Sequence, residues 1–269
     1  MATAFDAVWT GAVDSQWLTA GNWSPANEPT VNERILIPAG TRSIECVGMS
    51  NIQYTSLYVA PGYTGNIGTS GTRLTCSFVD LVHKGSGKIY FAEGSGTTTT
   101  FLVDAPGNVD AIDCTGSMTN FYLLRGTATL SGAGSYTLIT VGHRGSPSGD
   151  ATLTITSSGG TQAEIMQYGG RVTNASTCTL LYCMAGTFIQ QTGTAITTAN
   201  VGGAGNALLQ YESVTQMTLC RVLAGGTLDV TKNHSGVAVL TVATLNLLPG
   251  SLLIEDPLLL TVTNRNDWR

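Results

Sequence analysis

The chain has 269 residues, of which 42% are hydrophobic and 11% charged, with a net charge of −5 and a pI near 5.1. This hydrophobic content is too high for a disordered chain, and the few, scattered basic residues argue against a protein that binds nucleic-acid phosphates. No apolar run reaches the length needed to span a bilayer, and residues 247–260 are interrupted by Pro249, Gly250, Glu255, Asp256 and Pro257. We therefore expect neither nucleic acid nor a membrane as a partner.

Residues 1–40 form a segment of distinct composition. They contain three of the four tryptophans, Trp9, Trp17 and Trp23, and they close with the alternating sequence ERILIP, which predicts a strand. The N-terminal sequence MATAFDAVWTG lacks the basic start and apolar core of a secretory signal, so we expect synthesis in a cytoplasm.

From residue 41 onward the sequence repeats one phrase: a short apolar strand, a glycine, and a second short alternating strand. FYLLRGTATL (121–130), EIMQYGGRVTN (164–174) and LCRVLAGGTLDV (219–230) show it clearly. The aligned glycines are Gly126, Gly170, Gly186, Gly226 and Gly250, and six steps of the phrase cover the 124 residues between the first and the last. A step of about 21 residues is typical of one coil of a β-solenoid.

The predicted fold is therefore all-β, a parallel β-helix (β-solenoid) with an N-terminal cap. We expect about ten coils over residues 41–255 and a C-terminal tail over residues 256–269. A solenoid exposes an apolar end that invites edge-to-edge association, so it needs a cap. Trp9, Trp17 and Trp23 are the predicted cap residues.

The same segment carries a resemblance. The residues of the pattern are Trp9, Gly11, Ser15, Trp17, Asn22, Trp23, Pro29, Ile35, Ile37 and Pro38. This pattern resembles the leading segment of parallel β-helix repeat proteins found among bacterial surface adhesins and phage structural proteins. It covers about the first forty residues, and it implies a structural role without catalysis.

A compact solenoid that starts directly at Met1 is similar to phage virion proteins, which are made in the host cytoplasm. Among these, the resemblance favours a capsid cement, or decoration, protein on the exterior of the virion. The expected partners are the major capsid protein and further copies of the chain, as a homotrimer. The alternative is a tail spike, fibre or adhesin that binds, or binds and cleaves, host surface polysaccharide, and a stand-alone polysaccharide lyase ranks third.

The last residues, TNRNDWR (263–269), are the predicted contact with the capsid. Arg265, Trp268 and Arg269 place an aromatic ring between two arginines, a combination typical of binding hot spots.

Groups with catalytic chemistry are sparse. Asp104, Asp110 and Asp113 form the densest acidic group, but Asp110 and Asp113 are three residues apart and would lie on opposite faces of a strand. The histidines, His83, His143 and His234, each stand in a polar sequence with glycine, which predicts exposed loops. We expect no enzyme activity and no catalytic residues.

Six cysteines, Cys46, Cys76, Cys114, Cys178, Cys183 and Cys220, are expected to be reduced and mostly buried, because a cytoplasm disfavours disulfides. Cys178 and Cys183 have no second pair or histidine nearby, so no metal and no cofactor are expected. The aromatic residues stand mostly in predicted strands, where stacking ladders are the default and a carbohydrate platform is the alternative.

Overall fold

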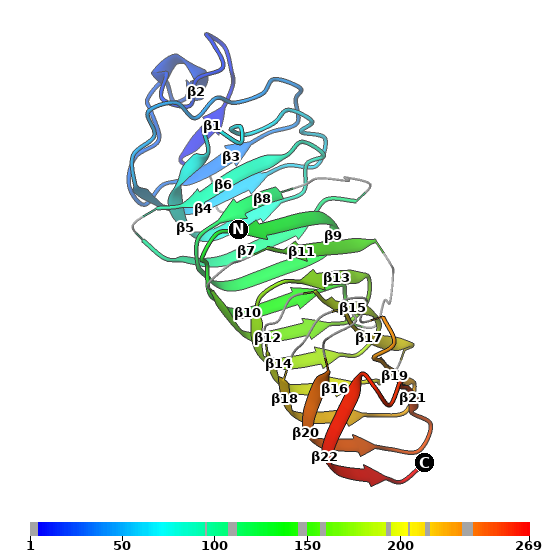
Figure 1. Ribbon diagram of the computed structural model, residues 1–269. Coiled ribbons are helices and arrows are strands. Elements are labelled where there is room, and N and C mark those ends of the chain that lie inside the picture. Colours follow the sequence, from blue (N-terminus) through cyan, green and yellow to red (C-terminus); the bar gives the residue numbers. More distant parts are fainter. Residues whose placement is uncertain are drawn as a thin grey trace. The chain divides into compact units, whose positions relative to one another are not determined.

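The computed structural model describes residues 5–94, 96–106, 112–144, 150–156, 160–191, 195–203, 205–212, 216–232 and 239–269 (Figure 1). The chain divides into two compact units, Met1–Ser131 (unit 1) and Gly132–Arg269 (unit 2). Each unit is a parallel β-solenoid, and together they contain about ten coils, which confirms the predicted fold class. In the described part of the chain the only helical element is a 3-10 turn, Ala20–Asn22, and no helix has the length and apolar character to cross a membrane.

Unit 1 has nine strands. They are β1 (Ala7–Trp9), β2 (Trp23–Ser24), β3 (Arg34–Ile37), β4 (Ile52–Val59), β5 (Leu74–His83), β6 (Ile89–Glu93), β7 (Thr98–Asp104), β8 (Ile112–Thr115) and β9 (Met118–Ser131). Face 1 of unit 1 is the parallel series β1, β3, β4, β5, β7 and β9. Face 2 of unit 1 contains β6, β8 and the second half of β9.

Unit 2 has thirteen strands, which alternate between two faces. Face 1 of unit 2 comprises β10 (Tyr136–Val141), β12 (Thr161–Gln167), β14 (Thr177–Cys183), β16 (Ile196–Val201), β18 (Gln216–Val222), β20 (Leu240–Leu247) and β22 (Leu260–Asp267). Face 2 of unit 2 comprises β11 (Ala151–Ile155), β13 (Arg171–Asn174), β15 (Gly186–Gln190), β17 (Ala207–Tyr211), β19 (Gly226–Asp229) and β21 (Leu252–Ile254).

The coil length agrees with the glycine spacing. On face 1 of unit 2, the residues in register are Ile139, Ile165, Leu181, Ala199, Cys220, Leu245 and Arg265. Successive members are 26, 16, 18, 21, 25 and 20 residues apart, a mean of 21. The mean step is thus the predicted one, whereas single coils differ by up to ten residues because the loops between strands vary in length.

The repeated glycines lie at the corner between the two faces. Gly170 and Gly186 have φ of +73° and +83°, a region that side chains rarely adopt. A Cβ at Gly170 would lie 2.0 Å from the carbonyl oxygen of Ala151, and one at Gly186 would lie 2.2 Å from that of Gly170. Glycine is required here because one corner stacks directly on the backbone of the next.

An aromatic ladder runs through the core of unit 1. Neighbouring ring centroids are 4.9 to 6.3 Å apart, in edge-on, tilted and stacked arrangements. The rings, in order, are Trp9, Trp23, Trp17, Tyr54, Phe78, Phe91, Phe101 and Phe121. The default expectation of stacked rings inside the solenoid is confirmed for this set.

The core of unit 2 combines aliphatic columns with buried amides. Asn174 donates to Gln190 Oε1 at 2.9 Å, and Gln190 donates to the carbonyl oxygen of Ser176 at 3.1 Å. Gln162 donates to the Ser176 hydroxyl, which itself donates to the carbonyl oxygen of Gly160. These side chains are fully buried, so their mutual hydrogen bonds offset the cost of removing them from water.

The solenoid extends beyond its predicted limits at both ends. The expected tail, residues 256–269, instead contains β22, which pairs in parallel with β20 over the whole of its length. Asp256 begins a turn between β21 and β22, accepting a hydrogen bond from Leu258 N on its side chain and from Leu259 N on its carbonyl. The Asp-Pro sequence therefore forms a turn between two strands of the solenoid and does not mark the end of the solenoid. Likewise β3 already pairs with β4 inside the expected cap segment, residues 1–40.

We predict that Gly170→Ala lowers the free energy of unfolding by at least about 2 kcal/mol, since it combines a positive φ with a backbone clash. Gly71→Ala is the control, because a Cβ at Gly71 meets nothing within 4 Å. Urea unfolding of both variants measures the difference. Equal stability of the two would contradict the close stacking of corners.

Candidate functional surfaces

The three predicted cap residues lie together. Trp9, Trp17 and Trp23 are 4%, 0% and 2% exposed, and Trp23 contacts both others, with centroids 5.1 Å from Trp9 and 4.9 Å from Trp17. Trp23 Nε1 donates to the carbonyl oxygen of Trp17 at 2.7 Å. Tyr54 of β4 continues the contact from Trp17 into the first coils. The cluster thus forms the N-terminal end of the aromatic ladder.

Asn22 organises the loop that holds this cluster. Its side chain is fully buried; Oδ1 accepts from the backbone N–H groups of Val13 and Asp14, and Nδ2 donates to Asp14 and to the carbonyl oxygen of Gln16. Gly11, at φ +58°, accepts a hydrogen bond from the Arg42 guanidinium. The asparagine of the Asn-Trp pair therefore satisfies the loop backbone while the adjacent tryptophan enters the core.

The predicted capsid-contact residues separate into two kinds. Arg265 forms a two-pronged ion pair with Glu255, both N–O distances being 3.0 Å, and Arg269 pairs with Asp267 at 2.7 Å. Trp268 is 57% exposed. Both arginines are thus engaged within the chain, and the indole of Trp268 is the part of this set that is open to a partner.

The position of Arg265 and Asp267 was not foreseen. In the parallel register Arg265 follows Leu245, and Asp267 follows Leu247, at sites where the preceding coils place buried side chains. Two of the three inward-facing columns of face 1 therefore have a charged residue on β22, an arginine and an aspartate, and the third, which contains Met217 and Val242, has Val262 there. The ion pair of Arg265 with Glu255, a residue just after β21, joins the two faces of unit 2 at this end.

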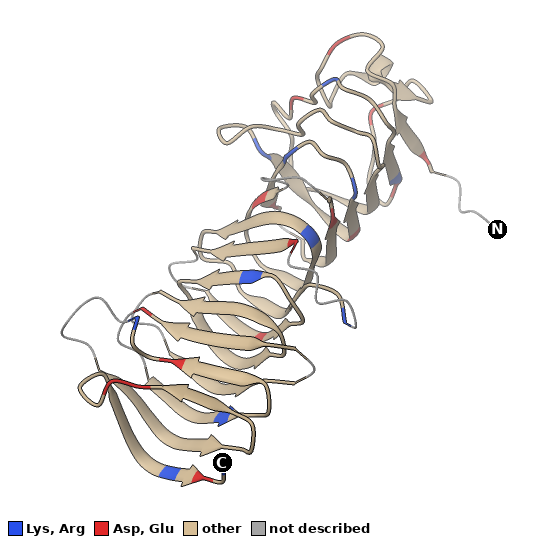
Figure 2. Ribbon diagram, turned by 90° about the vertical axis from the view of Figure 1, so that its right-hand side faces the viewer, with Lys and Arg blue, Asp and Glu red and all other residues tan. Residues whose placement is uncertain are grey.

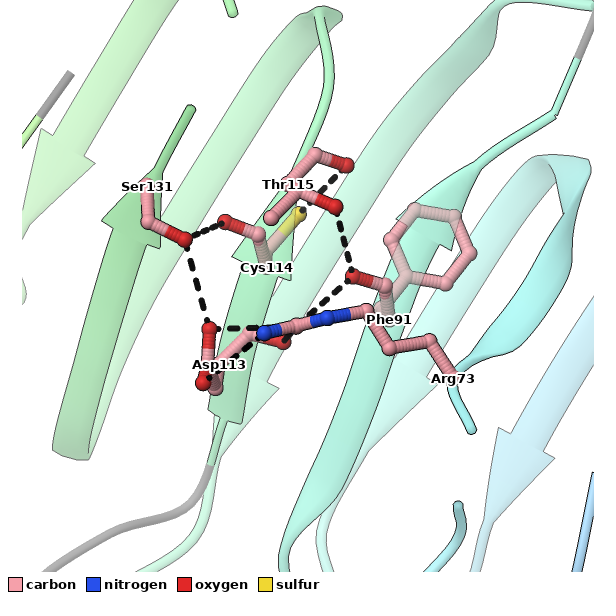
Figure 3. Close-up of polar contacts among 6 residues, drawn as sticks. All are labelled: Arg73, Phe91, Asp113, Cys114, Thr115 and Ser131. Atoms are coloured by element: carbon pink, nitrogen blue, oxygen red, sulfur yellow. Dashed lines mark hydrogen bonds and ion pairs between the residues drawn. The ribbon is translucent and has the colours of Figure 1, made fainter. Parts of the chain in front are cut away.

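The acidic residues that could serve catalysis are held by cations of neighbouring coils. Arg73 donates to Asp113 through both terminal nitrogens at 3.1 Å and to the Asp113 carbonyl at 2.9 Å, and Ser131 contributes a longer bond (Figure 3). Asp104 lies 2.6 Å from Arg125 Nε and 4.0 Å from Lys84 Nζ. Asp110 lies outside the described residues. Asp104 and Asp113 thus act as links between coils.

A further carboxylate, Glu93, was missed in the sequence. Burial raises the pKa of Glu93, and the backbone N–H groups of Thr98 and Ser117, at 2.7 and 2.6 Å, counteract that rise. These bonds tie the end of β6 to the first residue of β7 and to the loop before β9. Its sequence signal was weak, because a single glutamate at a strand end is common on any surface.

Of the two histidines that the structure describes, one is buried and the other is exposed. His83 is fully buried as the last residue of β5, and its Nε2 lies 2.9 Å from the Gly87 carbonyl oxygen. The expectation of an exposed loop was wrong for His83, because the strand alternation through Leu81 continues to it. His143 is exposed, and His234 lies outside the described residues. Among the residues that the structure describes, no three His, Cys, Asp or Glu side chains are grouped to hold a metal ion.

All six cysteines are buried with free thiols, which confirms their expected burial. Burial raises the pKa of the thiols of Cys46, Cys178, Cys183 and Cys220 to about 12. Cys178 and Cys183 stand at opposite ends of the inner side of β14, roughly 16 Å apart at the usual rise of a strand, so they cannot share a metal.

One shallow groove lies on face 2 of unit 2. Its volume is about 410 Å³. Its lining residues are Gly186, Thr187, Asn206, Ala207, Leu208, Thr227, Asp229, Leu252 and Ile254. Leu252 and Ile254 are 50% and 39% exposed, while Asp229 is turned to Thr231, whose N–H and hydroxyl donate to it. The groove is a mainly aliphatic surface without a reactive group.

Charged residues are spread thinly over the strands of both units (Figure 2). Outward positions on the faces are filled mainly by Thr, Leu, Val, Tyr and Asn. Comparison with protein-family models, with curated proteins and with solved structures finds no match to the chain.

We predict that Trp17→Ala lowers the free energy of unfolding by roughly 3 to 5 kcal/mol, as for other large core residues. Trp268→Ala removes an exposed indole, so it should change stability by less than about 0.5 kcal/mol. Thermal and urea unfolding compare the two variants. A Trp17→Ala protein as stable as the parent would exclude the capping role.

We also predict that the native protein resists alkylation at neutral pH, since buried thiols with a raised pKa supply almost no thiolate. After denaturation without reductant, all six thiols should react. Mass spectrometry of iodoacetamide-treated protein counts the adducts, and fewer than six adducts on the denatured chain would reveal a disulfide.

Proposed function

We propose that this chain is a capsid cement, or decoration, protein of a bacteriophage, which binds the major capsid protein on the exterior of the head as a homotrimer and stabilises the shell. The observation that carries the proposal is a division of roles. In the described part of the chain, the carboxylates of Asp104 and Asp113 join coils, while the centres of the sheet faces present mainly uncharged side chains.

The N-terminal segment supports the proposal through its resemblance to the leading segments of β-helical phage and adhesin proteins. The residues that carry the resemblance, including Trp9, Trp17, Asn22 and Trp23, interlock through buried ring contacts and hydrogen bonds. A motif used in this way has a structural purpose, and it leaves the rest of the surface available for attachment.

The outer surface supports protein–protein contact. Lasting interfaces have apolar centres depleted in charge, with aromatic residues enriched. The outward side of face 1 in unit 1 and the aliphatic groove on face 2 of unit 2 both have this character. Trp268, exposed beside Asp267 and Arg269, adds an aromatic anchor of the type found in binding hot spots.

The arrangement of carboxylates favours this function over polysaccharide cleavage. Glycoside hydrolysis needs two carboxyl groups that converge on one bond, one of them protonated. Asp104 and Asp113 are instead each engaged by a guanidinium of another coil, so both serve as links within the chain. A spike or adhesin remains the competing assignment, and the experiment below separates the two.

The test is co-sedimentation of the purified chain with particles of its phage prepared without it. We expect saturable binding at a fixed copy number, and particles that withstand higher temperature or chelator. Trp268→Ala should weaken binding at least about tenfold, the usual loss for an aromatic hot spot, while Val13→Ala, also at an exposed apolar residue, should not.

Protein that stays in the supernatant would overturn the cement proposal. Release of reducing sugar from host surface polysaccharide would overturn it in favour of a spike enzyme, and tight binding to that polysaccharide without release would favour an adhesin.

A further inference from the structure

An apolar stripe one side chain wide runs along the outside of face 1 of unit 1. Its members occupy one outward position in six successive strands and are paired in register from each coil to the next. They are Val8, Leu36, Tyr58, Val82, Leu102 and Tyr122. With strands about 4.8 Å apart, the stripe is about 24 Å long.

The solenoid itself does not require apolar residues at this position. On face 1 of unit 2, the outward position between the two inward columns holds polar residues in four consecutive strands: Asn200, Arg221, Asn246 and Asn266. All six stripe residues are half-buried by their own neighbours and still present apolar surface to solvent. An unbroken apolar series on one outer face indicates a surface that a partner covers.

A polar column borders the stripe on one side, and the other side is polar over its second half. Two residues before the stripe positions stand Asp6, Arg34, Ser56, Asp80, Thr100 and Asn120, of which the last five are paired in register. On the other side stand Pro38 and Ala60, followed by Lys84, Asp104 and Arg125. A narrow apolar centre with polar margins has the composition of a protein interface, with its core and its rim.

The margins show which partner fits. Asp80 is exposed and makes no ion pair with any residue that the structure describes. Lys84 stands on the opposite side of the stripe at the same strand level; its side chain is 37% exposed and its Nζ lies 4.0 Å from Asp104, at the limit of an ion pair. Asp80 and Lys84 are four residues apart in extended chain, roughly 13 Å, so they cannot pair within one copy. Consider copies that run parallel, in register, around a symmetry axis that lies along the stripe. In such an assembly the side of one copy that carries Asp80 faces the side of the next copy that carries Lys84.

In the same packing, Thr100 on strand β7 of one copy faces Asp104 on strand β7 of the next copy. An antiparallel two-fold pairing would instead lay the Asp80 column on its own copy, where the cation is Arg34, which is already bonded to Asp6. A face-to-face pair would also bury both polar margins. Three copies that converge on an axis bury the narrow stripe and leave the margins at the rim.

We propose that the stripe from Val8 to Tyr122 is the seam of a parallel, in-register homotrimer of this chain. The inference rests on the trimeric state within the proposed function and assigns its surface, orientation and register. The contact covers roughly 300 Å² per copy in projection, below the roughly 800 Å² of a standard interface, so the association should depend on protein concentration.

The first test is sedimentation equilibrium of the full chain over a wide concentration range. We expect a monomer–trimer equilibrium, which Leu102→Lys shifts to monomer by burying a charge at the axis. Leu219→Lys is the matched control: it changes a half-buried, outward leucine of face 1 in unit 2, and the trimer should persist. Circular dichroism and melting temperature verify that both variants fold.

The second test fixes orientation. Asp80→Lys and Lys84→Asp should each weaken the trimer at least about tenfold through like charges in three contacts, and the double exchange should restore most of the affinity. Lys84→Asp also places a second carboxylate near Asp104 of the same copy, and the double exchange leaves that change in place. Because residues 80 and 84 lie too far apart to pair within one copy, restoration by the double exchange can arise only between copies.

A parent chain that is monomeric at every concentration, a trimer that survives Leu102→Lys, or a double exchange without restoration would overturn the inference. The outcome is separable from that of the proposed function. If the chain forms a trimer through this seam but does not bind particles, the inference holds and the cement role is excluded. If the chain is a monomer that binds particles, the inference is wrong and the cement role holds.

Discussion

Backbone pairing between strands one coil apart is the interaction on which both units depend. It requires successive corners to stack closely enough for carbonyl and amide groups to meet, and corner glycines such as Gly170 and Gly186 permit this approach. Once the corners are in place, each strand hydrogen-bonds to the strand before it and the strand after it in a constant parallel register. A side chain then has its main neighbours about 4.8 Å above and below, at the same position in adjacent coils.

This geometry turns both the interior and the exterior of each unit into columns. Inside unit 1 the columns hold aromatic rings in continuous contact, and inside unit 2 they hold aliphatic side chains and an amide cluster around Ser176. On the outside, the same stacking lets a basic side chain contact an acidic one in a nearby coil. Arg73, for example, extends across Tyr90 of β6 to bond Asp113 of β8. Many of the charged side chains form such links, and much of the rest of the outer surface consists of apolar and hydroxyl-bearing side chains.

The glycine spacing was enough to predict the solenoid and its mean coil length, because the corner constraint acts on glycine directly. The burial of the three tryptophans and of the six cysteines followed from residue type and strand alternation. The links between coils could not be predicted, since coils of 16 to 26 residues leave the register undetermined, and the Arg73–Asp113 contact depends on that register. His83 was misjudged because the glycines after it were given more weight than the alternation before it. The end of the solenoid was misplaced because Asp256 and Pro257 mark a turn as readily as an exit.

The charged residues on β22 have a consequence for fibre growth. Stacked parallel coils are a template for further strands, as in cross-β fibrils, wherever an apolar inner column meets a free edge. A strand from another molecule placed on β22 would have to cover Arg265 and Asp267 and give up part of their exposure to water. Desolvating an arginine and an aspartate costs more than their mutual attraction returns unless the new strand supplies matching partners. Two of the three inner columns of face 1 thus present charged side chains at β22, which makes the addition of a foreign strand to this edge unfavourable.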